Sequence, residues 1–99
     1  MNETVYVRAC QVELEESGVS HDSERSVPIR YRGKLISTQR IDLLIEGQLI
    51  IEAKSVERIH PVHVAQAVSY LRATGLRLAL VINFNVVSLR LQGIRRVVL

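Results

Sequence analysis

The sequence predicts a small α/β domain, with a mixed β-sheet flanked by helices in the order α-β-β-β-α-β and a last β-strand at the end. The prediction rests on helical spacing in residues 3–17, strand-like segments between residues 27 and 53, and a second helix followed by an apolar strand between residues 61 and 84. Because a helix separates the third and fourth strands, the fourth should pair parallel to one of the first three.

The first predicted helix begins after Asn2, a residue that suits the N-cap position, and ends before Gly18, a typical stop signal. Residues 20–26 are polar, so we expect a loop or the entry to a strand there. A short strand is expected at residues 27–31, where Pro28 indicates an edge position or a strand start. Residues 32–34 are expected to form a turn.

Residues 35–45 predict the second strand, and residues 49–53 predict a third strand that is apolar enough to be buried on both faces. The second helix should begin at Pro61 and run to about Thr74, before Gly75. Residues 76–84 and 93–99 predict the last two strands.

Composition places the chain among ordinary globular proteins. A length of 99 residues fits one domain, here expected to span residues 1–99, and 47% hydrophobic residues argue against disorder. Cys10 is the only cysteine, which excludes an intrachain disulfide and suggests a cytoplasmic protein. The net charge of +3 is mild, but arginines far outnumber the two lysines, and the guanidinium group suits phosphate oxygens.

Three charged residues stand where apolar strands would otherwise continue: Asp42 in the second strand, and Glu52 and Lys54 in the third. Burying charge beside a core is costly unless the charges are paired or bind a metal. Two carboxylates supply the hard oxygen ligands that Mg²⁺ prefers, and a nearby lysine can position water or neutralise charge on a phosphate. The pattern therefore suggests metal-assisted phosphodiester hydrolysis, whereas an ion pair on an edge strand is the simpler structural alternative.

The metal-site hypothesis also predicts how the second and third strands pair. Side chains alternate across a strand, so Asp42 should share a face with Leu44, and Glu52 should share one with Lys54. A three-residue loop around Gly47 would place both carboxylates on the same face. A two-residue loop would put them on opposite faces of the sheet.

Further candidates come from the two helices. In the second helix, His63, Gln66 and Tyr70 recur at helical spacing and are expected to form one polar stripe near Lys54. In the first helix, Glu3 and Tyr6 lie on one face, and Glu3 could supply a third carboxylate to the metal. For His63, a solvated helix start is the simpler alternative; for Glu3, it is a surface residue favoured by the helix dipole.

Taken in order, these motifs resemble the GxxExxY proteins, small bacterial proteins of the PD-(D/E)XK nuclease superfamily. Nearly the whole chain takes part in the resemblance, through Glu3-Thr-Val-Tyr6, Ile41-Asp-Leu-Leu44, Ile51-Glu-Ala-Lys54, Pro61-Val-His63, Gln66 to Leu71, Gly75-Leu76, Ile82-Asn-Phe-Asn85 and Gly93-Ile-Arg-Arg96. One departure is clear: the glycine of the name motif would precede Met1, and the family's extra N-terminal helix is missing, as in an N-terminally short member.

The resemblance implies a restriction-endonuclease-like core with a metal bound by an aspartate and a glutamate. It also implies that Gln66 and Tyr70 correspond to the extra motif of the RecB-like branch, which acts on DNA ends or single strands. The chain is accordingly expected to be a metal-dependent deoxyribonuclease using Mg²⁺ or Mn²⁺. The expected roles are metal binding by Asp42, Glu52, Glu3 and the Ala53 carbonyl, catalysis by Lys54 and Gln66, and substrate binding by His63, Tyr70, Arg40 and Tyr6.

Two alternatives to an active enzyme stay open. The chain could be a catalytically silent domain that binds nucleic acid while keeping the nuclease fold, or a protein-interaction domain. A homodimer is a further expectation, because so small a domain offers few recognition loops and because Val86, Val87 and Leu89 form an apolar stretch that could be exposed.

Overall fold

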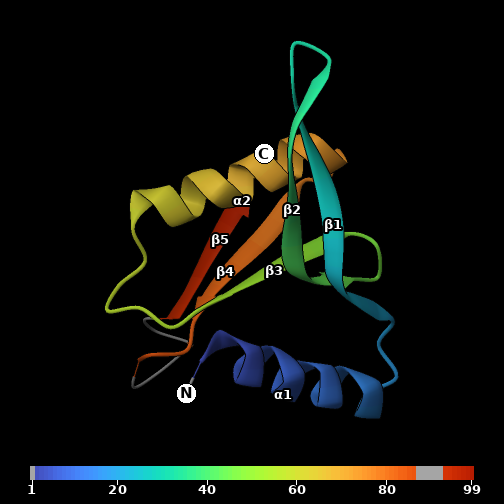
Figure 1. The fold of residues 1–99 in the computed structure, drawn as a ribbon. Coiled ribbons are helices and arrows are strands. Elements are labelled where there is room, and N and C mark those ends of the chain that lie inside the picture. The colour runs from blue at the N-terminus through green and yellow to red at the C-terminus, as the bar shows by residue number, and fades with distance from the viewer. Residues whose placement is uncertain (1, 87–92) are drawn as a thin grey trace.

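The computed structural model describes residues 2–86 and 93–99, and its elements follow the order predicted from the sequence. Helix α1 (Glu3–Glu16) precedes three strands, β1 (His21–Tyr31), β2 (Lys34–Ile45) and β3 (Leu49–Lys54). Helix α2 (Pro61–Thr74) and strands β4 (Leu78–Asn83) and β5 (Ile94–Val98) complete the fold (Figure 1). Val87 and Leu89, named above as exposed apolar residues, lie outside the described residues.

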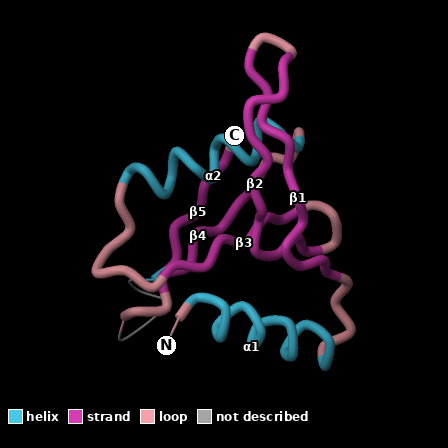
Figure 2. The backbone as a smooth tube through the Cα atoms, in the orientation of Figure 1, coloured by secondary structure: helices cyan, strands magenta, loops and turns pink. Residues whose placement is uncertain are grey.

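The five strands form one mixed sheet in the order β1-β2-β3-β4-β5 (Figure 2). Strands β1, β2 and β3 form an antiparallel meander, and β5 pairs antiparallel to β4. Strand β4 pairs parallel to β3 across the α2 crossover, as the sequence predicted. The boundaries of α1 and α2 agree with the predicted ones to within a residue, with Asn2 capping α1 and Gly75, in the left-handed conformation, ending α2.

The two helices lie on opposite faces of the sheet (Figure 1). The main hydrophobic core lies between the sheet and α2, and includes Ile41, Leu44, Ile50, Leu71 and Val81. Helix α1 has no buried residue, and an apolar cavity of about 330 Å³ separates it from the other face of the sheet. Burial of apolar surface therefore fixes α2 firmly, while α1 is held mainly by contacts at its N-terminal end.

One prediction about the strands is wrong. Residues 20–26 were expected to be a loop or strand entry, but β1 begins at His21 and pairs with β2 from His21↔Ile45 onward. The error has a physical reason: β1 is an edge strand and Val27 is its only buried residue, so the strand needs no alternating apolar pattern. Backbone pairing with β2, rather than side-chain burial, holds its first half.

Beyond the sheet, the β1–β2 hairpin continues as a projection that we call the arm, defined as residues 25–40. It rises past α2 and ends at the turn formed by Arg32 and Gly33, both with positive φ (Figure 1). Most of its side chains are exposed, and only Val27 is fully buried. The pairing shifts by one residue between Ile29 and Arg30, a β-bulge that increases the local twist of the hairpin.

Candidate functional site

The β2–β3 hairpin has the register that the metal-site hypothesis requires. Leu44 pairs with Ile50 and Ile45 pairs with Leu49, so the loop contains three residues, 46–48. Gly47 and Glu46 both take positive φ, which closes the turn. Continuing this register brings Asp42 opposite Glu52, and the prediction of a three-residue loop is confirmed.

At Asp42 the regular alternation of β2 breaks. Ile41 and Leu44 both belong to the core beneath α2, although residues three apart should face opposite sides of a regular strand. On the facing strand Glu24 has a φ of 54°, and the pairing passes from Ser23↔Leu43 to Arg25↔Ile41. The expectation that Asp42 and Leu44 share a face is therefore not met. Between Ile41 and Leu44 the side chains of β2 no longer alternate regularly between the two faces of the sheet, and the arm begins at this point.

Reciprocal hydrogen bonds nevertheless hold the two predicted acids side by side. The backbone amide of Asp42 donates to Oε1 of Glu52 at 3.2 Å, and the backbone amide of Ala53 donates to Oδ2 of Asp42 at 2.7 Å. Carboxylates thus replace the regular ladder between β2 and β3 where these strands separate. Oδ1 of Asp42 and Oε2 of Glu52 have no hydrogen bond to another described residue, so one oxygen of each acid is available to a ligand.

Two further oxygens predicted as ligands lie nearby. The amide and carbonyl of one strand residue point to the same side of the strand, so the Ala53 carbonyl faces β2 and Asp42, as its amide does. Glu3, in the first turn of α1, accepts a hydrogen bond from the Ser55 amide at 2.9 Å through Oε2. Glu3 therefore ties the start of α1 to the end of β3, and its charge acts on both Asp42 and Glu52.

Burial raises the pKa values of both acids. Glu52 is only 4% exposed, and burial, followed by the neighbouring charge of Asp42, raises its pKa to about 8. Burial is also the main reason why the pKa of Asp42 lies above its usual value, and the bond from Ala53 opposes it. Within residues 2–86 and 93–99, neither acid forms a salt bridge, and the charge of Lys54, which lowers both pKa values, only partly offsets these effects.

Lys54 begins a hydrogen-bonded chain that leads into α2. Its Nζ donates to Oε1 of Gln66 at 3.0 Å, and Nε2 of Gln66 donates to the Tyr70 hydroxyl at 3.0 Å. Tyr70 is only 2% exposed, so it belongs to the core rather than to the expected polar stripe, and burial followed by the charge of Glu52 raises its pKa. A buried tyrosine thus orients the amide that holds the Lys54 ammonium group.

The other predicted residues lie at varying distances from this centre. Nδ1 of His63 accepts a hydrogen bond from the His60 amide at 2.9 Å, which caps α2, and burial followed by the charge of Lys54 lowers its pKa. Tyr6 stacks on Phe84, with ring centroids 4.4 Å apart, and so joins α1 to the end of β4. Arg40 is exposed at the base of the arm. Substrate binding by these residues stays a prediction.

Two residues that sequence analysis did not single out also shape the site. Glu24 lies across from Asp42 and its charge helps to raise the pKa of that acid. Asn83 is 1% exposed; its amide group bonds to both the N–H and the C=O of Val56, at 3.1 and 2.9 Å, and so fixes the chain that follows Lys54. A polar residue within an apolar strand was the available signal for Asn83, whereas nothing in the local sequence marks Glu24.

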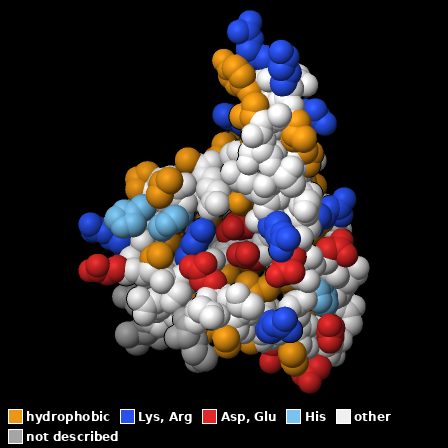
Figure 3. Space-filling view, in the orientation of Figure 1, with side chains coloured by type: hydrophobic (Ala, Val, Ile, Leu, Met, Phe, Trp, Pro, Cys, Tyr) orange, Lys and Arg blue, Asp and Glu red, His pale blue; other side chains and the backbone are white. Residues whose placement is uncertain are grey.

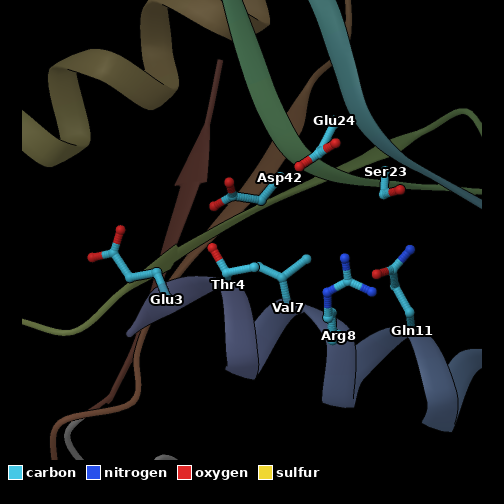
Figure 4. A pocket seen from close by; sticks show the side chains of 8 residues that line it. All are labelled: Glu3, Thr4, Val7, Arg8, Gln11, Ser23, Glu24 and Asp42. Atoms are coloured by element: carbon cyan, nitrogen blue, oxygen red, sulfur yellow. The ribbon is translucent and has the colours of Figure 1, made fainter. Parts of the chain in front are cut away.

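A cavity of about 260 Å³ opens beside Asp42, between α1 and the β1–β2 hairpin. Figure 4 shows Glu3 and Asp42 at one end of it and Arg8 and Gln11 pointing from α1 toward the strands. In the space-filling view, acidic side chains gather in the hollow between α1 and the sheet (Figure 3). The hollow is thus wide enough to admit a small group next to the free oxygen of Asp42.

The donor set fits a divalent cation held largely by non-protein ligands. In the described part of the chain, no cluster of three or more Asp, Glu, His or Cys residues could hold a metal on its own. The paired acids, each with an available oxygen, and the Ala53 carbonyl supply only hard oxygen donors. Mg²⁺ is commonly bound in this way, by one or two carboxylates with water and substrate oxygens as the remaining ligands.

Comparison with known families agrees with the fold of the chain. The family model described as the PD-(D/E)XK nuclease superfamily matches residues 1–97. The chain belongs to the PD-(D/E)XK nuclease superfamily. No curated protein and no solved structure gives a significant match.

For a PD-(D/E)XK nuclease-superfamily member, the observed fold is the expected one: a mixed sheet with helices on both faces, consistent with a restriction-endonuclease-like α/β fold. Proteins of this superfamily typically use divalent metals, and membership points to nucleic acid as the class of substrate. Among the described helices, none is both long and apolar enough to cross a membrane.

Proposed function

We propose that this protein is a metal-dependent nuclease that hydrolyses phosphodiester bonds in DNA, with Asp42, Glu52 and Lys54 at its centre. The observation that carries the proposal is the pair of adjacent, partly buried carboxylates with no salt-bridge partner among the described residues. Superfamily membership over residues 1–97 supports it. The motifs quoted above favour a GxxExxY-type protein, related to the RecB-like branch.

In this proposal, Asp42, Glu52 and the Ala53 carbonyl hold Mg²⁺ or Mn²⁺, and Glu3 completes the acidic wall from α1. When bound there, the cation polarises the phosphate and makes a water molecule more acidic. Lys54 stays close to the acids and holds its ammonium group toward the reacting phosphate, while Gln66 and Tyr70 fix its direction. Arg40, His63 and Tyr6 are proposed to contact the substrate.

The direct test is a cleavage assay with purified protein on supercoiled plasmid and on labelled oligonucleotides. We expect cleavage when Mg²⁺ or Mn²⁺ is present at roughly 5 to 10 mM, which should saturate a weak metal site. We expect no cleavage in EDTA. Absence of cleavage with either metal on every substrate would contradict the proposal. Nucleic-acid binding without cleavage would instead support the catalytically silent alternative.

Lys54 can be tested separately from the metal ligands. Replacing Lys54 with methionine keeps the length of the side chain but removes the ammonium group, so the cleavage rate should fall about 100-fold. Binding of Mn²⁺, followed by calorimetry, should be retained. The exposed Arg77→Met variant is the matched control and should cleave at the wild-type rate. A Lys54→Met enzyme that keeps full activity would exclude the proposed role.

A further inference from the structure

We propose that the arm, residues 25–40, grips a nucleic-acid duplex and leads its backbone to the acidic site. This inference rests on the proposed function and adds to it an element of substrate recognition and a substrate class.

The charge of the arm is entirely of one sign. It contains five basic residues and no Asp or Glu, although the whole chain has 10 acidic residues against 13 basic ones. The basic residues are all exposed: Arg25, Arg30, Arg32, Lys34 and Arg40. Figure 3 shows Lys and Arg side chains at the tip of the projection, away from the acidic hollow. Such separation of charge attracts a polyanion to the arm and leaves the metal-binding acids at its base.

The shape of the arm suits a groove of a duplex. A two-stranded β-ribbon fits the major groove of B-form DNA. From Arg25 to the turn at Arg32 the ribbon extends roughly 23 Å, at about 3.3 Å per residue. The β-bulge at Ile29 and Arg30 adds twist, which helps a ribbon to follow a helical groove.

The position of the arm places the proposed duplex-binding element next to the proposed metal-binding acids. Asp42 follows Arg40 by two residues on the same strand, so the ribbon and the metal-binding pair belong to one continuous element. The break in the side-chain alternation between Ile41 and Leu44 includes Asp42 itself. A duplex held along the arm would therefore have its backbone close to the cavity beside Asp42.

The arm also exposes apolar side chains, which raises the alternative that a second copy of the chain covers it. Tyr31, Leu35 and Ile36 are 64%, 55% and 64% exposed. Two arms packed together would bring five basic residues of one copy against five of the other, and of these only Arg25 is paired with an acid, Asp22, among the described residues, which makes the contact unfavourable. Against a duplex, the same apolar groups can contact sugars and thymine methyl groups.

The test is binding of a fluorescein-labelled 20-base-pair DNA duplex, measured by anisotropy in EDTA so that no cleavage is needed. The triple variant Arg30→Gln, Arg32→Gln, Lys34→Gln should bind at least 10-fold more weakly at about 0.1 M salt. Its salt-dependence slope should fall by about 2 to 3, because each lost phosphate contact removes about 0.9. The control variant Arg77→Gln, Arg95→Gln, Arg96→Gln removes the same charge near the opposite edge of the sheet and should lose less than about 3-fold.

Several outcomes would overturn the proposal. Equal losses in both triple variants would mean that only net charge matters, and unchanged binding in the arm variant would exclude the arm. Tighter binding to the single strand than to the duplex would exclude the duplex as the substrate class. Light scattering that shows a wild-type dimer, which dissociates in Tyr31→Ser, Ile36→Ser while DNA affinity is kept, would assign the arm to a second copy.

The binding assay is independent of the nuclease activity. Arm-dependent duplex binding in a protein that never cleaves would contradict the proposed function but would still support the proposal for the arm. Metal-dependent cleavage with an arm variant that binds and cuts normally would contradict only the proposal for the arm. Both triple variants change exposed side chains, and a thermal melt should confirm that they fold like the wild type.

Discussion

Replacing Asp42 with asparagine should reduce metal-dependent DNA cleavage by about 10³-fold or more, which corresponds to about 4 kcal/mol of lost transition-state stabilisation. Asparagine has the same shape and can still accept the hydrogen bond from the Ala53 amide, so the junction of β2 and β3 should persist. What disappears is one of the two carboxyl groups proposed to hold the metal. The measurement is the initial rate of plasmid cleavage over a range of Mg²⁺ concentrations.

The matched control for this prediction is Asp22→Asn, the same chemical change at an exposed residue of the neighbouring strand, where Asp22 forms an ion pair with Arg25 at 3.6 Å. Surface ion pairs contribute little to stability, so this variant should cleave within about twofold of wild type. An Asp42→Asn protein that keeps more than about a tenth of wild-type activity at saturating Mg²⁺ would contradict the assigned role.

Replacing Glu52 with glutamine should stabilise the metal-free protein at alkaline pH. Glu52 has a pKa of about 8 in the folded state, against an ordinary value of 4.5, so the folded state holds a proton that the unfolded chain has already released. Stability linked to this group is therefore fully present below about pH 4.5 and is lost as the pH rises through 8. At pH 8.5 the variant should melt about 10 °C or more above wild type, whereas near pH 4.5 the two should differ little.

Bound metal should reverse the difference in melting temperature between wild type and Glu52→Gln. Mn²⁺ should raise the melting temperature of wild type, because ligation favours the ionised carboxylate, and should have little effect on Glu52→Gln. The affinity of wild type for Mn²⁺ should also rise between pH 6 and 8, as the proton on Glu52 is more easily displaced. Glu57→Gln, at an exposed position, is the control and should melt like wild type at each pH. A Glu52→Gln protein less stable than wild type at pH 8.5 without metal would contradict this explanation.

The parts of the structure that depend on burial and turn chemistry could be predicted from the local sequence. Charged residues at Asp42 and Glu52, set among apolar residues, marked the site, since only pairing or metal binding makes such burial tolerable. The three-residue loop around Gly47 followed from requiring both acids to meet, and the observed register confirms it. The parallel pairing of β3 and β4 followed from the helix between them.

The parts that were missed depend on tertiary context. The first half of β1 has no apolar pattern because, at the edge of the sheet, pairing with β2 alone holds it. The break in side-chain alternation at Asp42, opposite Glu24, depends on how the hairpin twists over α2. The spacing of residues along the sequence does not predict this twist. Tyr70 was assigned to a polar stripe because of its helical spacing from His63 and Gln66, whereas its ring lies in the core and its hydroxyl bonds to Gln66.

The central claim is that Asp42 and Glu52 jointly hold a divalent cation, and the most direct measurement is a crystal structure of the protein soaked in Mn²⁺, with anomalous scattering used to locate the metal. We expect one strong anomalous peak bonded to both carboxylates at about 2.1 Å, with the Ala53 carbonyl and water among the remaining ligands. No peak between these carboxylates under saturating Mn²⁺, or a metal bound elsewhere on the protein, would contradict the account.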